Sequence, residues 1–259
     1  EPRNGNPPPR VKEISSGILT SIGLQNPGAD FFMKNIMPKV KEACKPNQII
    51  VSIAGNTVED YANLCATISE KYGKGDIAAI EINAACPNVK LGGGAFCSKP
   101  DAMRELLSAV MKVTTLPVIA KINTNYDNTV EIAKVIEESG VDAIATTSTP
   151  LGMSIDIKKR KPALGNIKGP ISGRAIRPIG VGKVWDIYRA VKIPISPSGG
   201  IYTTEDALEY IMAGATAVEI GSAHFINPRA SLEILEGLKA FMVENGISDI
   251  SSLVGVAHK

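Results

Sequence analysis

The sequence is poor in several features that would assign it to a class of protein. No apolar run approaches the roughly 20 residues that a membrane-spanning helix needs. The net charge is only +2, with Lys and Arg scattered, which argues against nucleic acid or an anionic membrane as the main partner. Two histidines and four cysteines form no CxxC pair and no zinc-like cluster, so we predict no metal site. No signal-peptide pattern is visible, and we expect a cytoplasmic protein with reduced thiols, although spacing leaves a disulfide between Cys86 and Cys97 open.

Alternating apolar and amphipathic segments predict an α/β fold. Short apolar runs predict six strands, at 49–53, 77–82, 117–122, 142–146, 193–196 and 217–220. Helical spacing or cap signals predict helices at 29–44, 57–72, from 101 onward, and at 128–139, 178–191, 204–212 and 227–244. Thr57, Thr204 and Asn227 are the expected caps. Residues 150–177 are expected to form a long irregular insertion. Near-continuous apolar strands are typical of a buried parallel sheet.

Six strand–helix units predict a (β/α)8 TIM barrel whose first two strands would precede Glu1. We therefore expect residues 1–259 to form a single, N-terminally incomplete barrel domain. The opening EPRNGNPPPR would be an odd start for a compact domain and is interpreted as an internal loop of something longer. An open doubly wound sheet is the alternative. No GxGxxG follows the first predicted strand, which favours the barrel.

Two glycine sites follow the last two predicted strands. Gly199 and Gly200 come after 193–196, and Gly221 with Ser222 comes after 217–220. In a barrel these loops adjoin, and glycines there let backbone N–H groups approach a phosphate. The alternative is that they are turn glycines needed only for positive φ.

Two side chains at strand ends indicate chemistry. Lys121 ends an apolar strand and must reach a polar partner, which could be an electron-rich ring or a phosphate. Cys86 precedes Pro87, which stiffens the loop, and modest tuning makes a thiol a usable base at neutral pH. Cys97 is the rival base in the same loop.

Other residues near the Cys86 loop have simpler interpretations. Asn83 and Asn88 each offer a donor and an acceptor, which suits the edge of an imide-like ring, with loop capping as the alternative. Cys44 and Cys65 lie in predicted helices and are interpreted as inert buried thiols.

The segment 83–89 (Asn-Ala-Ala-Cys-Pro-Asn-Val) resembles the active-site loop of class 1 dihydroorotate dehydrogenases, where cysteine is the base. The resemblance extends over nearly the whole chain and includes 3–7, 22–28, 149–153 with Asp156, and 171–178. It is greatest to the NAD-linked branch, whose FMN subunit pairs with an iron–sulfur flavoprotein subunit. A tRNA dihydrouridine synthase shares a Cys-Pro loop but would want a strongly basic face.

The resemblance implies an FMN-dependent oxidation of dihydroorotate to orotate in pyrimidine biosynthesis, with Cys86 as the base and hydride transfer to the flavin. It also implies a homodimer, with or without an iron–sulfur/FAD electron-transfer subunit. The implied substrate-binding residues are Thr20, Ile22, Gly23, Leu24, Asn83, Asn88, Ser148 and Thr149. The implied FMN-binding residues are Ser52, Asn83, Lys121, Thr147, Gly173, Gly199, Gly200, Gly221 and Ser222.

The chain departs from the family pattern at four positions. Thr20, Ser52 and Ser148 stand where asparagines are usual, and Pro197 replaces the first glycine of GxGG. A hydroxyl cannot make the two-pronged contact of an amide. Two alternatives therefore stay open: a related flavoenzyme acting on another dihydropyrimidine or cyclic amide, and a degenerate, non-catalytic barrel subunit.

Overall fold

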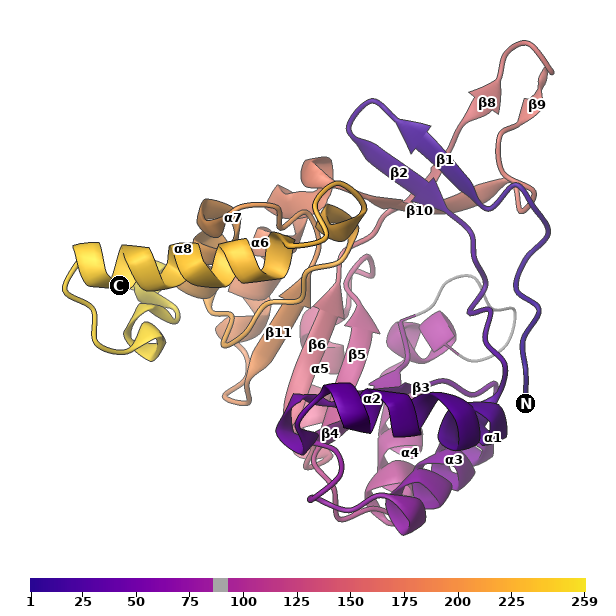
Figure 1. Cartoon of the computed structure of the whole chain (residues 1–259), viewed down its shortest axis with the longest axis horizontal. Helices are drawn as coiled ribbons and strands as arrows, with labels where there is room; N and C mark the ends of the chain where they lie inside the picture. Colours follow the sequence, from indigo (N-terminus) through magenta and orange to yellow (C-terminus); the bar gives the residue numbers. More distant parts are fainter. Residues whose placement is uncertain (86–92) are drawn as a thin grey trace.

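A five-stranded parallel sheet lies at the centre of the computed structural model, which describes residues 1–85 and 93–259 (Figure 1). The spatial order β11-β6-β5-β4-β3 follows the chain in reverse, and each strand pairs in parallel with the next. The strands are β3 (Ile50–Ile53), β4 (Ala79–Asn83), β5 (Val118–Asn123), β6 (Ala143–Thr147) and β11 (Ile195–Ser198). Five of the predicted strands are thus confirmed.

The sixth predicted strand, 217–220, is wrong as a strand, because only an isolated bridge between Ser198 and Glu219 forms there. The Pro197 carbonyl accepts a hydrogen bond from the Glu219 N–H at 2.8 Å. The backbone nitrogen of Pro197 points to the same side of its strand as this carbonyl, and so it also faces residues 217–220. Proline has no N–H to donate, and the ladder loses the bond that would extend the bridge.

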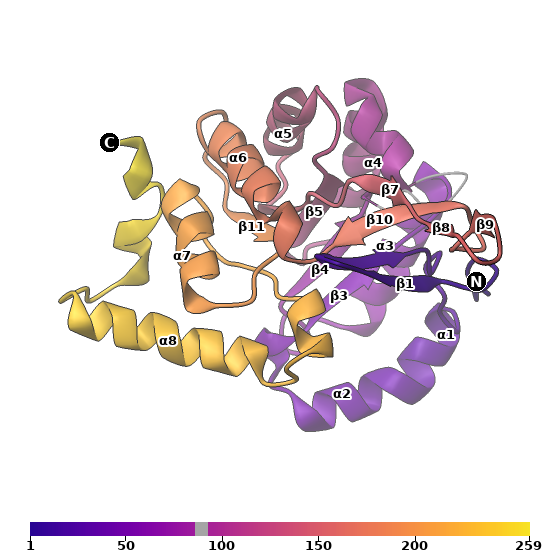
Figure 2. The same cartoon turned by 90° about the horizontal axis from the view of Figure 1, so that it is seen from above.

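Helices pack side by side in chain order along one face of the sheet (Figure 2). They are α3 (Val58–Lys71), α4 (Pro100–Met111), α5 (Thr129–Glu138), α6 (Arg177–Tyr188) and α7 (Thr204–Ala213), with α8 (Ala230–Glu244) against α7. Their apolar stripes and the strands enclose one core in which Tyr61, Ile80, Ile82 and Leu106 are fully buried. In the part of the chain that the structure describes, no helix has both the length and the apolar character needed to cross a bilayer.

Shorter helical segments complete the fold. The predicted helix 29–44 is confirmed in outline, but a π-helical stretch interrupts it. These segments are α1 (Ala29–Phe31), η1 (Phe32–Ile36), α2 (Met37–Ala43), η2 (Pro46–Gln48), η3 (Gly93–Ser98), η4 (Arg174–Ile176), η5 (Ser222–Phe225), η6 (Ile250–Leu253) and η7 (Val256–His258).

The predicted helix caps have mixed outcomes. Thr57 caps α3 in a reciprocal box with Asp60, as expected. The cap predicted at Thr204 is wrong, because Thr203 has the extended backbone and accepts from the Asp206 N–H. The start predicted at Asn227 is also wrong: its side chain accepts from the Arg229 N–H two residues on, and α8 begins only at Ala230.

A four-stranded antiparallel sheet lies beyond the carboxyl ends of the parallel strands (Figure 1). Its order is β1-β2-β10-β7, from β1 (Val11–Ile14), β2 (Gly17–Thr20), β10 (Lys168–Ser172) and β7 (Leu151–Met153). A hairpin of β8 (Ile155–Asp156) and β9 (Lys161–Pro162) extends from it. The irregular insertion predicted at 150–177 is therefore wrong. Strand β10 pairs with β7 inside the insertion and with β2 outside it, and the second partner cannot be found from the insertion alone.

Candidate functional site at the strand ends

Four predicted ligand-binding residues come from adjacent parallel strands. Ser52 lies on β3, Asn83 on β4, Lys121 on β5 and Thr147 on β6. The sheet register places Asn83 opposite Lys121 and Ser52 opposite Glu81. Since ligand-binding groups of α/β barrels gather at the carboxyl ends of the strands, this register brings together the residues that the sequence had assigned separately.

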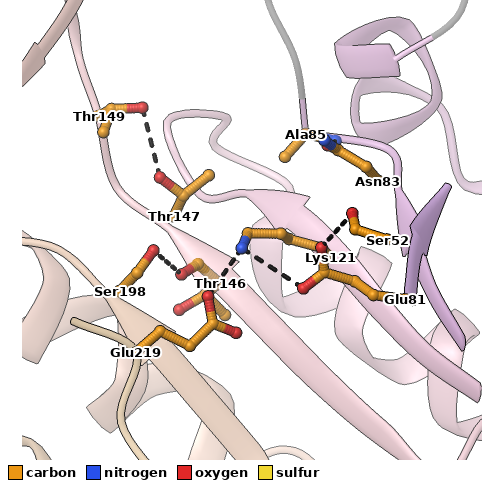
Figure 3. A network of polar contacts seen from close by, with 10 residues as sticks. All are labelled: Ser52, Glu81, Asn83, Ala85, Lys121, Thr146, Thr147, Thr149, Ser198 and Glu219. Carbon is orange, nitrogen blue, oxygen red and sulfur yellow. Dashed lines mark hydrogen bonds and ion pairs between the residues drawn. The ribbon is translucent and has the colours of Figure 1, made fainter. Parts of the chain in front are cut away.

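Lys121 is held between two carboxylates (Figure 3). Its Nζ lies 2.7 Å from Glu219 Oε2 and 3.4 Å from Glu81 Oε2, and Ser52 donates to the other Glu81 oxygen at 2.6 Å. The Lys121 side chain is 22% exposed and that of Glu81 only 11%, so these charges are largely withdrawn from water. The prediction that Lys121 needs a polar partner is confirmed.

The electrostatics of this network follow from burial and pairing. Burial acts to lower the pKa of Lys121, but Glu81 and Glu219 outweigh it, so that the pKa is raised and the ammonium stays charged. For Glu219, burial raises the pKa and the attraction of Lys121 only partly opposes it. The nearby Glu81 carboxylate adds to the effect of burial, so the pKa of Glu219 is raised overall.

Asn83 fixes the start of the loop that carries the predicted base. Its side-chain oxygen accepts from the Ala85 N–H at 3.2 Å, and its carbonyl accepts from the Tyr61 hydroxyl at 2.7 Å. Cys86 and Asn88 lie outside the described residues, so their assignments stay predictions.

The other three cysteines carry free thiols. Cys97, the rival base, is 1% exposed and donates to the Ala84 carbonyl at 3.1 Å. Burial raises the pKa of its thiol to about 12, which makes it a poor base at neutral pH. Burial also raises the pKa of Cys65, as suits the inert thiol expected there, and Cys44 directly follows α2.

The hydroxyls at and after the end of β6 differ in their access to solvent: those of Thr147 and Thr149 lie near the surface, and that of Ser148 is buried. The Thr147 and Thr149 hydroxyls lie 3.4 Å apart at the strand end. Ser148 is fully buried, and its hydroxyl lies 2.5 Å from that of Thr124. The structure therefore commits the Ser148 hydroxyl to the interior of the protein, whereas the sequence had suggested a substrate contact.

The predicted phosphate-binding glycines come together from distant segments. Gly173 has φ 129°, and a Cβ there would lie 2.6 Å from the Ser16 carbonyl oxygen. Gly200 has φ 73°, and its Cβ would lie 2.9 Å from the Gly173 carbonyl oxygen. Positive φ and close backbone approach both require glycine at these two positions. Gly199 precedes Gly200 in the same turn, and its carbonyl accepts from the Tyr210 hydroxyl at 2.8 Å.

A cleft of about 860 Å³ opens beside these glycines. Strands β1 and β2 form one side, and Arg174, Tyr202, Ser222, Phe225 and Ile226 line the rest. Its volume lies in the range of small-ligand and cofactor sites. Gly221, which precedes Ser222, would have open space where a Cβ would stand. Ser222, which follows Gly221, lines the cleft together with the cation of Arg174, and a hydroxyl with a cation suits a phosphate group.

The remaining predicted contacts fall in two places. Thr20 and Ile22 line the same cleft as Ser222, whereas Leu24, Ser52 and Asn83 line a second cavity of about 450 Å³. Gly23, with φ 76°, packs against Asn6, whose backbone N–H donates to the Ile22 carbonyl at 2.9 Å. The Ile22 carbonyl, predicted to face substrate, is thus engaged by the N-terminal segment.

Sequence reasoning missed Glu81, Glu219, Arg174 and Tyr202. A signal existed for the first two, because each is a carboxylate inside an apolar run, as Lys121 is an ammonium inside one. Buried charges of opposite sign require each other, so the three could have been matched. Arg174 and Tyr202 stand in loops without such a contrast.

A five-stranded parallel sheet covered by helices, with Ser52, Asn83 and Lys121 toward the carboxyl ends of its strands, fits the class of α/β TIM barrels. A solved structure supports this class: the crystal structure of DHODH from Eimeria tenella in complex with ferulenol superimposes with a TM-score of 0.80 over 100% of this chain and 77% of that chain, at 21% identity. The predicted fold class is confirmed.

The chain belongs to the dihydroorotate dehydrogenase family, whose model matches residues 1–242. It is 48% identical, over 100% of its length and 83% of the relative's, to the "Dihydroorotate dehydrogenase B (NAD(+)), catalytic subunit" of Desulforamulus reducens. Identity to the protein of the same name from Desulforudis audaxviator is 43% over 100% of this chain and 83% of that one. The resemblance noted in the sequence is confirmed.

Proposed function

We propose that this chain catalyses the oxidation of dihydroorotate to orotate, forming the C5–C6 double bond in pyrimidine biosynthesis. The observation that carries the proposal is the full-length likeness to catalytic subunits of that name, together with Asn83 and Lys121 at adjacent strand ends. It makes the chain an oxidoreductase acting on a CH–CH donor.

FMN is the cofactor that we propose. When bound, it supplies the acceptor for the hydride that leaves C6 of the substrate. The cleft of about 860 Å³, which Ser222 and Arg174 line, supports this assignment. The residues proposed to hold it are Ser52, Asn83, Lys121, Thr147, Gly173, Gly199, Gly200, Gly221 and Ser222.

The chain's own residues orient the substrate and remove a proton. The oxygen of the Asn83 amide already accepts from Ala85, which presents its nitrogen as a donor to a substrate carbonyl. Asn88 would supply a second amide and Thr149 a hydroxyl. Cys86, as thiolate, takes the proton from C5. The Tyr61 hydroxyl holds the Asn83 backbone and so fixes where this loop begins.

Anaerobic mixing with dihydroorotate tests the proposal. The flavin absorbance of the protein should bleach, and dihydrouracil and other cyclic amides or imides serve as controls for substrate identity. A protein that binds flavin but is bleached only by another cyclic amide would overturn the substrate. A protein that stays colourless with added FMN would indicate a non-catalytic barrel.

Cys86→Ser tests the base within the same assay. Because serine ionises far less readily than cysteine, flavin reduction near neutral pH should slow by roughly 10²–10⁴-fold. Cys97→Ser is the matched control, and its rate should stay within a few fold. An unchanged rate in Cys86→Ser would remove this thiol from the mechanism.

The proposal includes a protein partner and a compartment. The relatives are named catalytic subunits of NAD(+) enzymes, which supports a second, electron-transferring subunit. A homodimer is the other partner arrangement that we propose. Phe225 and Ile226, 81% and 78% exposed at the edge of the cleft, suit such a contact. The free thiols of Cys44, Cys65 and Cys97 favour a cytoplasmic location.

A further inference from the structure

A cationic and aromatic pair stands on the wall of the cleft outside the set of residues that the sequence assigned. Arg174 follows Gly173, and the centre of its guanidinium lies 4.5 Å from the centre of the Tyr202 ring. The Tyr202 hydroxyl donates to Ser222 Oγ at 2.9 Å. All three side chains line the cleft, and the Arg174 side chain is 59% exposed. A positive charge is thus placed beside the hydroxyl of Ser222.

Buried Asp206 anchors this pair from behind. It is 2% exposed, and its Oδ2 accepts from the backbone N–H groups of Tyr202 at 2.8 Å and Thr203 at 3.0 Å. Its other oxygen pairs with Arg177. Arg174 Nη1 stays 3.7 Å from Oδ2, which is beyond hydrogen-bond length. Asp206 therefore orients the Arg174 guanidinium without taking up its N–H groups.

Stacking leaves the edge of a guanidinium available. The Arg174 guanidinium lies over the Tyr202 ring and both side chains line the cleft, so N–H groups that the ring does not cover can donate to a ligand there. The N–H groups of a guanidinium lie in one plane and can donate two parallel hydrogen bonds to the oxygens of a phosphate monoester. They cannot make an equally strong interaction with the neutral hydroxyl of an unphosphorylated flavin. Gly173 directly precedes Arg174, and Gly200 lies against Gly173, because a Cβ on Gly200 would lie 2.9 Å from the Gly173 carbonyl oxygen.

We propose that Arg174, stacked on Tyr202, binds the terminal phosphate of the flavin and makes the site select phosphorylated over unphosphorylated flavin. This inference rests on the proposed function, since it names a further binding residue of the same cofactor site. Tyr202 is a positioning residue, which acts by holding the guanidinium and, through its hydroxyl, Ser222.

The experiment compares the affinities of apo-protein for FMN and riboflavin by quenching of flavin fluorescence. Arg174→Ala should weaken FMN binding on the order of 10- to 100-fold, as for a charge-assisted contact, and change riboflavin binding by less than about 3-fold. Arg174→Lys should recover only part of the FMN affinity, because it keeps the charge without the fork. Arg104→Ala, on α4 and paired with Glu138, is the matched control and should change neither.

Tyr202 variants test the positioning role. Tyr202→Ala should weaken FMN binding in the wild-type background but add little to Arg174→Ala, whereas Tyr202→Phe keeps the platform and should cost only a few fold. Equal FMN-to-riboflavin preference in wild type and Arg174→Ala would overturn the inference while leaving the proposed function in place. Wild-type protein that binds neither flavin would overturn the proposed function itself.

Discussion

The interior of the parallel sheet and the wall of the cleft each present one cation to the candidate site, and they hold it differently. Lys121 is largely buried and ion-paired to two carboxylates, while Arg174 is exposed and supported by an aromatic face. A buried charge must be paired, so its neighbours become part of the fold. An exposed, stacked charge such as Arg174 can be removed while its buried neighbour Asp206 keeps the ion pair with Arg177. Stability and binding should therefore be coupled at Lys121 and separable at Arg174.

The largest expected effect is that of Lys121→Met. It leaves Glu81 and Glu219 facing each other without a cation, and the free energy of unfolding should fall by about 3 kcal/mol, alongside weaker flavin binding. The raised pKa of Lys121 means that this stabilisation is fully present below the pKa of lysine in the unfolded chain and is lost only as pH rises through the folded value. Urea denaturation at pH 7 measures it.

The control for this change is Lys134→Met on the exposed face of α5, which should stay within about 0.5 kcal/mol of wild type. If the free energy of unfolding fell by a similar amount in both variants, the ion pairs of Lys121 would contribute nothing to stability beyond what a solvated lysine contributes.

Ser52→Ala should have an intermediate effect. Its hydroxyl donates to a carboxylate, and loss of that bond should lower the free energy of unfolding by about 1–2 kcal/mol. Ser198→Ala removes a bond to the neutral Thr146 carbonyl and should cost less. Thermal or urea unfolding and FMN titration of both variants would show whether Ser52 serves the network, the cofactor or both. If Ser52→Ala lost flavin affinity without losing stability, Ser52 would act as we expect of Arg174, as a residue whose role in binding is separable from its role in folding.

The smallest expected effect is that of Glu219→Gln, and it lies in the pH profile. Because the folded-state pKa of Glu219 is raised, its contribution to stability is fully present below the pKa of the unfolded glutamic acid and is lost as pH rises through the folded value. Glutamine does not titrate, so the variant should gain stability relative to wild type as pH rises above about 4, the pKa of glutamic acid in the unfolded chain. Glu236→Gln on α8 is the control. If it changed the pH dependence of stability as much as Glu219→Gln does, the change would not come from the network around Lys121.

The sequence predicted those parts of the fold that depend on local pattern. The apolar strands were found from their composition, and Thr57 with Asp60 is a cap that four residues suffice to define. The antiparallel sheet was missed because β10 pairs with the remote strand β2, and short strands of mixed burial carry no signal of a remote partner. The predicted strand 217–220 failed for the same reason, because a residue outside it, Pro197 in the neighbouring strand β11, limits its pairing to one bridge at Glu219.

Prediction of the site divides along the same line. Lys121 can be found from the sequence because it is a charged residue in an apolar run, and the glycines because they directly follow predicted strands. Ser148 follows the strand by position, yet Thr124 captures its hydroxyl, which depends on a contact between two loops. Arg174 and Tyr202 are ordinary loop residues until packing stacks them.

The pairing of β2 with β10 has a consequence for the order in which the protein assembles. More than half of the chain lies between Leu19 and Ile171, which pair directly. Contacts of such long range are costly in loop-closure entropy and form late unless the intervening chain has already compacted. The parallel strands, whose neighbours are consecutive, can form first during synthesis. The wall of the cleft would then close last, so that a nascent chain acquires its core before it acquires the ability to retain a cofactor.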